Sequence, residues 1–238
     1  TEDGLLLRKR AEELVDLMEK TKAELTASDE TISGEIRIGG GETEAISILA
    51  QAAKDLQNDY PLIRYRIYSG DSEHITEHLD KGLIDFGLLV EPVDITKYEY
   101  VRLPVKDTWG VLMRHDSLLA EKEAVSAEDL WDKPLIVSHQ TSADSEMAAW
   151  FKRDLSKLNI VMNYELIYNA SHFVKKGFGY AIALDKIINA TEESGLCFKP
   201  LYPKLEAGLC VVWKKYQVFS RASEMFLRQL QKELKTNN

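Results

Sequence analysis

Glycines, hydroxyl side chains and amides gather in three short segments of this sequence, each directly after a predicted strand. The segments consist of Gly40, Gly41, Glu42 and Thr43; of Ser69, Gly70, Asp71 and Ser72; and of His139, Gln140, Thr141 and Ser142. The first two precede predicted helices, so backbone N–H groups at a helix N-terminus would face a ligand together with the hydroxyls. This combination favours an anionic or strongly polar small molecule, with Asn169 as a further edge of the site.

The same residue types have a simpler explanation, because Ser, Thr and Asp are good helix N-caps. One such loop alone would indicate only a cap, whereas three in one fold favour ligand binding. The carboxylates of Glu42 and Asp71 either point away from the ligand or select one with an amino or hydroxyl group. We expect the Thr43 and Thr141 hydroxyls to bind the ligand. Replacing either residue with valine should weaken binding while leaving the ligand-free melting temperature almost unchanged.

Catalysis and metal binding have weaker signals. His74, Glu77 and His78 match the H-x-x-E-H pattern of one class of zinc peptidase, but no third metal ligand stands out downstream. The serines and the two cysteines, Cys197 and Cys210, lack the glycine-flanked turn of a catalytic nucleophile. The sequence therefore predicts no catalytic residue, no metal site and no cofactor.

Charge and composition limit the partners of the chain. Its 238 residues include 30 basic and 39 acidic side chains, for a net charge of −9. This balance argues against a broad nucleic-acid surface and against an anionic membrane. No apolar run reaches the roughly 18 residues of a membrane span, and Glu2 and Asp3 do not resemble the start of a signal peptide. The prediction is a soluble cytoplasmic protein, for which two cysteines suit a reducing compartment.

Strand and helix patterns alternate from residue 34 onward and restart after residue 92. The expected strands are residues 35–38, 63–68, 84–90, 109–113, 135–138, 161–168, 179–184, 197–201 and 209–213. The expected helices are residues 44–58, 73–81, 127–130, 145–158, 172–176, 185–190 and 220–234. Such alternation indicates parallel β-α-β units. It predicts an α/β protein with two lobes, one from residues 32–92 plus 209–238 and the other from residues 93–208.

The first 30 residues are expected to form a separate linker helix, with a polar hinge at residues 26–33. An apolar seam repeats at spacings of four and three, through Leu7, Ala11, Leu14, Met18, Thr21 and Leu25. The helix could lie on its own domain or pair with a second helix. The narrow stripe favours pairing.

The ordered set of motifs resembles the LysR-type transcriptional regulators, specifically their linker helix and effector-binding domain. The resemblance rests on the entry strand at residues 34–39, Tyr60-Pro61, Gly70, Leu79, residues 82–87 and the glycine-bracketed segment at residues 177–182. It implies a two-lobed fold like that of type II periplasmic binding proteins. The winged helix-turn-helix that the family carries upstream is not part of this sequence.

The resemblance implies the effector-sensing part of a bacterial transcription regulator. Such a domain binds a small polar metabolite between its lobes and associates as a homodimer or homotetramer. DNA would be contacted only through the helix-turn-helix. A periplasmic solute-binding protein of the same fold is the alternative, and the heptad helix argues against it. An enzyme comes third, because no catalytic constellation is convincing.

Overall fold

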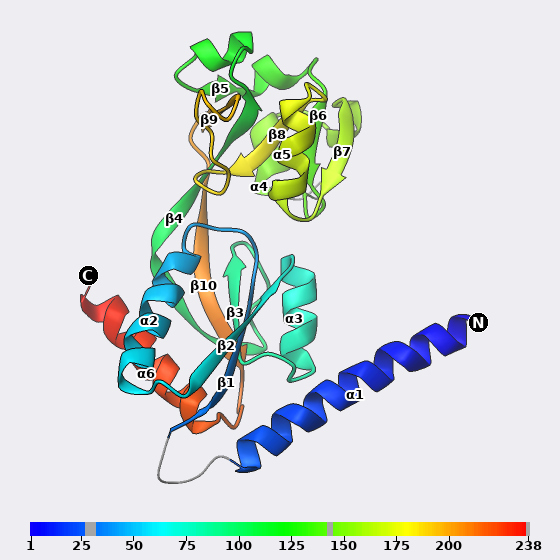
Figure 1. Ribbon diagram of the computed structural model, residues 1–238. Helices are drawn as coiled ribbons and strands as arrows, with labels where there is room; N and C mark the ends of the chain where they lie inside the picture. Colours follow the sequence, from blue (N-terminus) through cyan, green and yellow to red (C-terminus); the bar gives the residue numbers. More distant parts are fainter. Residues whose placement is uncertain (27–31, 142–144, 237–238) are drawn as a thin grey trace. The chain divides into compact units, whose positions relative to one another are not determined.

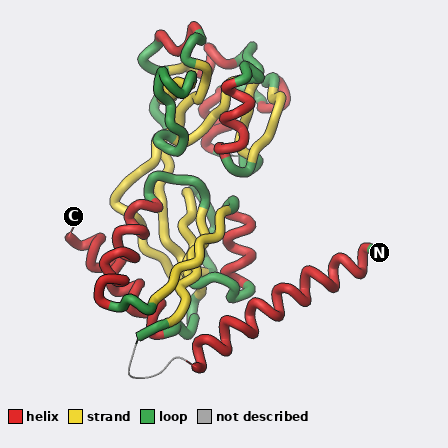
Figure 2. Tube along the Cα trace, viewed as in Figure 1, coloured by secondary structure: helices red, strands yellow, loops and turns green. Residues whose placement is uncertain are grey.

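Strands and helices alternate along the chain in the computed structural model, which describes residues 1–26, 32–141 and 145–236 (Figures 1 and 2). Most of the expected hinge, residues 27–31, lies outside the described residues. The chain divides into two compact units. Unit 1 consists of Thr1–Gly40, Ile46–Pro104 and Cys210–Asn238, and unit 2 of Gly41–Ala45 and Val105–Leu209. The passage from unit 1 to unit 2 thus falls after Pro104 rather than after residue 92, because β4 is one long strand, Tyr98–Arg114.

Unit 1 is a sheet with helices on both faces (Figure 1). Its strand order is β2-β1-β3-β10-β4, and β1 is parallel to both β2 and β3. Its elements are α1 (Glu2–Thr26), β1 (Gly34–Gly40), α2 (Ile46–Asp59), β2 (Ile63–Ser69), α3 (Ser72–Asp80), β3 (Phe86–Val90), the first part of β4, most of β10 (Glu206–Lys214) and α6 (Arg221–Thr236).

Alternate residues of β3 supply the two faces of this core. Phe86 packs against Phe226 of α6, with ring centroids 5.2 Å apart. On the other face, Gly87 lies against side chains of α3. In β1, a Cβ atom at Gly39 would lie 2.6 Å from Cδ1 of Ile84 and 2.8 Å from Cδ1 of Ile75. The glycine run is therefore needed for close packing, and β1 extends to Gly40 instead of ending at residue 38.

The strands of unit 2 follow the order β4-β8-β6-β7, and β9 pairs with β4 and β5. Strand β6 is parallel to β7 and β8, whereas β4 is antiparallel to β8 and β9. Its other elements are η1 (Leu118–Glu121), β5 (Val125–Ser126), η2 (Ala127–Leu130), β6 (Leu135–Ser138), α4 (Glu146–Phe151), η3 (Leu155–Lys157), β7 (Ile160–Tyr164), α5 (Ile167–Lys175), β8 (Tyr180–Leu184) and β9 (Leu196–Tyr202). Met147, Trp150 and Phe151 of α4 belong to one core cluster, and Ile167, Ala170 and Val174 of α5 to another.

Four expected elements of unit 2 are wrong in extent or type. The helix expected at 145–158 stops at Phe151, because Lys152 adopts a left-handed conformation with φ of 52°. The helix expected at 185–190 is a turn, in which Lys186 has φ of 65°. The strand expected at 161–168 ends at Tyr164, and the next helix begins at Ile167, well before residue 172.

Helix α1 contacts the rest of unit 1 through charged side chains. The Lys20 ammonium lies 2.7 Å from Oδ1 of Asp85, and Lys81 lies 2.7 Å from Glu13. The Asp16 carboxylate is 3.2 Å from the Arg37 guanidinium. The expected seam lies on a different face as far as Thr21, with Leu7, Leu14 and Met18 exposed, while the Leu25 side chain lies outside the described residues. The helix thus lies on its own unit but keeps its apolar stripe accessible. No helix in the described part of the chain is long and apolar enough to cross a membrane.

Candidate functional site

The first group of expected site residues lies at the carboxyl ends of β1 and β2. The two strands are in register so that Gly40 is opposite Ser69, and the Gly70 N–H donates to the Gly40 carbonyl over 3.2 Å. Both segments therefore end side by side at one edge of the unit 1 sheet. The structure brings Gly40, Ser69, Gly70, Asp71 and Ser72 together, as parallel strands require.

The Asp71 carboxylate is the N-cap of α3. Its Oδ1 accepts the His74 N–H over 2.9 Å and lies 2.8 Å from Nδ1 of the same histidine. A buried anion at this helix end is stabilised by the positive end of the helix dipole. The H-x-x-E-H pattern lies on this helix, where Nδ1 of His78 is 2.8 Å from the His74 carbonyl. The described residues contain no group of three or more potential metal ligands.

The second group belongs to unit 2 and begins with Glu42. Its Oε2 lies 2.5 Å from the Ile167 backbone nitrogen, whose N–H it accepts. Ile167 is the first residue of α5, and its N-cap, Leu166, has no side chain that can accept a hydrogen bond. The Glu42 carboxylate caps this helix from 125 residues away. This contact explains why α5 begins at Ile167.

Thr43 is buried and its hydroxyl already has two partners. Its Oγ1 donates to Oδ2 of Asp107, at 2.5 Å, and accepts the Ala45 N–H over 3.1 Å. Burial raises the pKa of the Asp107 carboxyl above its usual range, while the Thr43 hydroxyl and Lys186 lower it in part. Thr43 therefore holds the loop 41–45 to β4 through a buried hydrogen bond.

Replacing Thr43 with valine should destabilise the ligand-free protein, contrary to what the sequence suggested. The change leaves the buried Asp107 carboxylate without its donor, and we expect a loss of about 1–3 kcal/mol near pH 7. Because Thr43 bonds the charged form, its removal raises the pKa of Asp107 further. The loss should therefore shrink as the pH falls through that pKa. Urea unfolding between about pH 4 and pH 7 measures it. In an Asp107→Asn background, the stability loss caused by Thr43→Val should no longer depend on pH. If the dependence persists, Asp107 is not the titrating partner of Thr43.

The third group follows β6 as a turn. The His139 N–H donates to the Tyr164 carbonyl over 2.7 Å, and the Thr141 N–H to the Ser138 carbonyl over 3.0 Å. His139 and Gln140 are exposed. Ser142 lies outside the described residues. Asn169, expected at a loop edge, is an exposed residue in the first turn of α5, the helix that Glu42 caps.

Sequence reasoning missed two residues that shape these loops. Asp107 lies within β4, two residues before the strand expected at 109–113, and its burial was not visible in the sequence. Tyr164 donates its hydroxyl to the Ile182 carbonyl over 2.6 Å, and burial together with Glu42 raises its pKa. The resulting loops are held by backbone hydrogen bonds and by the Glu42 and Thr43 side chains, and they present backbone groups, hydroxyls and amides. Such groups suit the binding of a polar molecule.

The comparisons with known proteins agree with this architecture. The sequence model of the LysR substrate binding domain matches residues 29–235. An uncharacterised HTH-type transcriptional regulator of Shigella flexneri, YfeR, is 24% identical over 94% of this chain and 73% of its own length. The HTH-type transcriptional regulator YtlI of Bacillus subtilis is 28% identical over 98% of this chain and 76% of its own.

Solved structures share the fold. The effector binding domain of QuiR, solved in complex with shikimate, superimposes with a TM-score of 0.72 at 17% identity. The match covers 86% of this chain and 99% of that domain. The expected fold, an α/β architecture like that of type II periplasmic binding proteins, is confirmed.

Proposed function

Because this chain belongs to the LysR substrate-binding domain family, we propose that it senses a small polar effector through the loops at residues 40–43, 69–72 and 139–141. The match of the family over residues 29–235 carries this proposal. The loops support it, since they gather donors and acceptors at the carboxyl ends of parallel strands, where open α/β sheets bind ligands. Asn169 is proposed as a further contact.

The capping contacts divide the proposed residues into two roles. Glu42 and Thr43 are engaged by Ile167 and Asp107, so they position the loop. Thr141, by contrast, forms no side-chain hydrogen bond with the residues that the structure describes, which leaves its hydroxyl available. We assign direct contact to Thr141, His139 and Gln140.

The wider function follows from the relatives. The similar proteins are transcriptional regulators, so we propose that the chain is not an enzyme, that it works in the cytoplasm and that DNA is contacted by a helix-turn-helix in the complete regulator. We also propose self-association through the apolar stripe of α1. A periplasmic receptor would have no use for that stripe, and the relatives favour the regulator.

The effector site can be tested by ligand screening. Small polar metabolites, with shikimate among them, are screened by thermal shift, and calorimetry then gives the affinity of the best ligand. Thr141→Val should weaken its binding by about 1–3 kcal/mol while the ligand-free melting temperature stays the same. Thr191→Val removes a hydroxyl from an exposed turn of the same unit and serves as the control.

The outcomes separate the site from the function. A ligand whose affinity is unchanged by Thr141→Val and by Ser69→Ala would place the effector site elsewhere. A screen in which no polar metabolite stabilises the protein would contradict effector sensing itself.

A further inference from the structure

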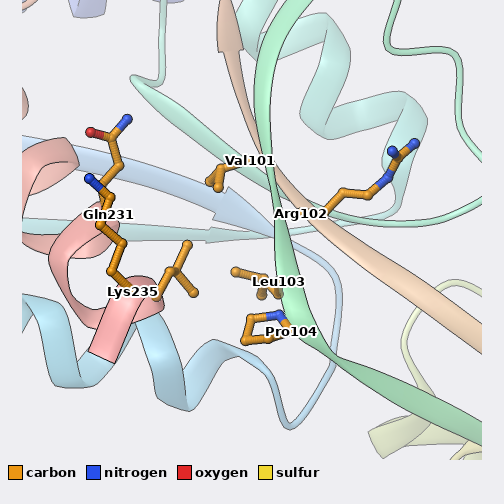
Figure 3. A pocket seen from close by; sticks show the side chains of 7 residues that line it. Val101, Arg102, Leu103, Pro104, Gln231 and Lys235 are labelled. Carbon is orange, nitrogen blue, oxygen red and sulfur yellow. The ribbon is translucent and has the colours of Figure 1, made fainter. Parts of the chain in front are cut away.

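A groove in unit 1 lies between the first part of β4 and the last turns of α6 (Figure 3). Its volume is about 600 Å³, within the range of small-molecule sites. Strand β4 contributes Val101, Leu103 and Pro104, and α6 contributes Gln231, Leu234 and Lys235. The lining is therefore apolar on the strand side, with an amide and an ammonium group from the helix.

Lys235 supplies the available positive charge of this groove. Arg102 also belongs to the lining, but its side chain extends to the other side of β4 from Gln231 and Lys235 (Figure 3). There its Nε lies 3.0 Å from Oε1 of Glu91, and its guanidinium carbon is 5.2 Å from the centre of the Tyr100 ring. The Arg102 charge is thus engaged elsewhere.

Among the described residues, no acidic side chain lines the groove, although the chain has 39 acidic residues. Within the described ranges, the Gln231 and Lys235 side chains form no hydrogen bond or ion pair. Two donors without partners beside an apolar wall match a molecule with a carboxylate at one end and an apolar body at the other.

The strand itself argues against a peptide as the occupant. Strand β4 is the last in the unit 1 order, and a peptide could extend the sheet there only by pairing with backbone donors and acceptors. Pro104 has no N–H to offer, and proline is one of the residues that protect sheet edges from pairing. A small molecule can bind without backbone hydrogen bonds to the strand.

We propose that this groove is a second ligand site, which takes a small carboxylate with an apolar body. The body packs on Val101, Leu103 and Leu234, and the carboxylate accepts hydrogen bonds from Lys235 and Gln231. This proposal is independent of the effector loops described above, because none of their residues lines the groove.

The test uses 4-phenylbutanoate as the probe and its neutral amide, 4-phenylbutanamide, as the matched compound. Methyl NMR spectra of the whole chain are recorded while each compound is added at millimolar concentration. The acid should shift the methyl signals of Val101, Leu103 and Leu234 in a saturable manner, and it should bind more tightly than the amide.

Two variants and one control test whether Lys235 and Gln231 bind the carboxylate. Lys235→Gln should weaken binding of the acid about fivefold, the usual scale of a partly exposed ion pair, and leave the amide unaffected. Gln231→Glu should weaken it at least as much by repulsion. Lys54→Gln removes an exposed lysine of α2 and should change nothing.

Three results would overturn the proposal. The first is the absence of saturable shifts at the groove. The second is shifts confined to residues 40–43, 69–72 and 139–141, which would assign the acid to the effector loops. The third is equal binding of acid and amide to the parent and to Lys235→Gln.

Discussion

The Asp85→Ala variant should lose about 3–5 kcal/mol of stability, the usual cost of removing one partner from a buried ion pair. Only 3% of the Asp85 side chain and 10% of the Lys20 side chain is exposed. Besides Lys20, Asp85 accepts the Arg37 backbone N–H over 2.8 Å. Alanine leaves a buried ammonium and a buried N–H without this acceptor. Urea unfolding gives the change, and hydrogen exchange of β1 and β3 should rise.

Two variants serve as controls for Asp85. Glu12→Gln breaks an exposed ion pair with Arg8 on the same helix and should cost less than about 1 kcal/mol. The double variant Lys20→Met, Asp85→Asn keeps an acceptor for the Arg37 N–H and removes both charges. It should therefore be more stable than Asp85→Ala. If Asp85→Ala costs no more than Glu12→Gln, the ion pair does not hold α1 to unit 1.

Replacing Leu14 and Met18 with glutamate should raise the dissociation constant of the proposed α1-paired dimer at least about 100-fold. Leu14 and Met18 are 68% and 63% exposed within one chain, on a face of α1 that does not contact the rest of unit 1. Pairing with a second α1 would bury them, and charges there would be costly to desolvate. Sedimentation equilibrium across micromolar concentrations measures the change.

A charge-matched variant makes this result specific. Lys9→Glu changes the net charge by −2, as the double replacement does, but lies outside the seam. Its dimer should dissociate as the parent does. A parent chain that is monomeric at micromolar concentration, or a Leu14, Met18 double variant that remains dimeric, would contradict pairing through α1.

Much of the fold could be predicted from local sequence. Strand β6 begins and ends at the expected residues, 135 and 138, because a short apolar run between polar residues has one plausible structure. Helix α3 was expected within one residue, since Asp71 signals its start and Gly82 its end. Errors occurred where backbone conformation changed without a glycine or proline to signal it, as at Lys152 and Lys186.

The candidate loops were also predicted from sequence, and their binding of a ligand stays a prediction; the hydrogen-bond partners of their side chains were not predicted. Local patterns place Glu42 and Thr43 after a strand, yet they carry no information on what these side chains meet in space. Their partners, Ile167 and Asp107, are 125 and 64 residues away along the chain. The structure therefore made Thr43 a buried anchor, where the sequence suggested a ligand contact.

The sequence by itself determined the family, through the order of its motifs along the chain. It also determined the alternation of strands and helices and the apolar stripe of α1, because these depend on the types and spacing of nearby residues. Only the tertiary structure decided which face of α1 lies on unit 1. That choice depends on Lys20 meeting Asp85, 65 residues away, in a buried position where an ammonium group is stable only beside an anion. Such pairs form once the chain has folded, and no local periodicity records them.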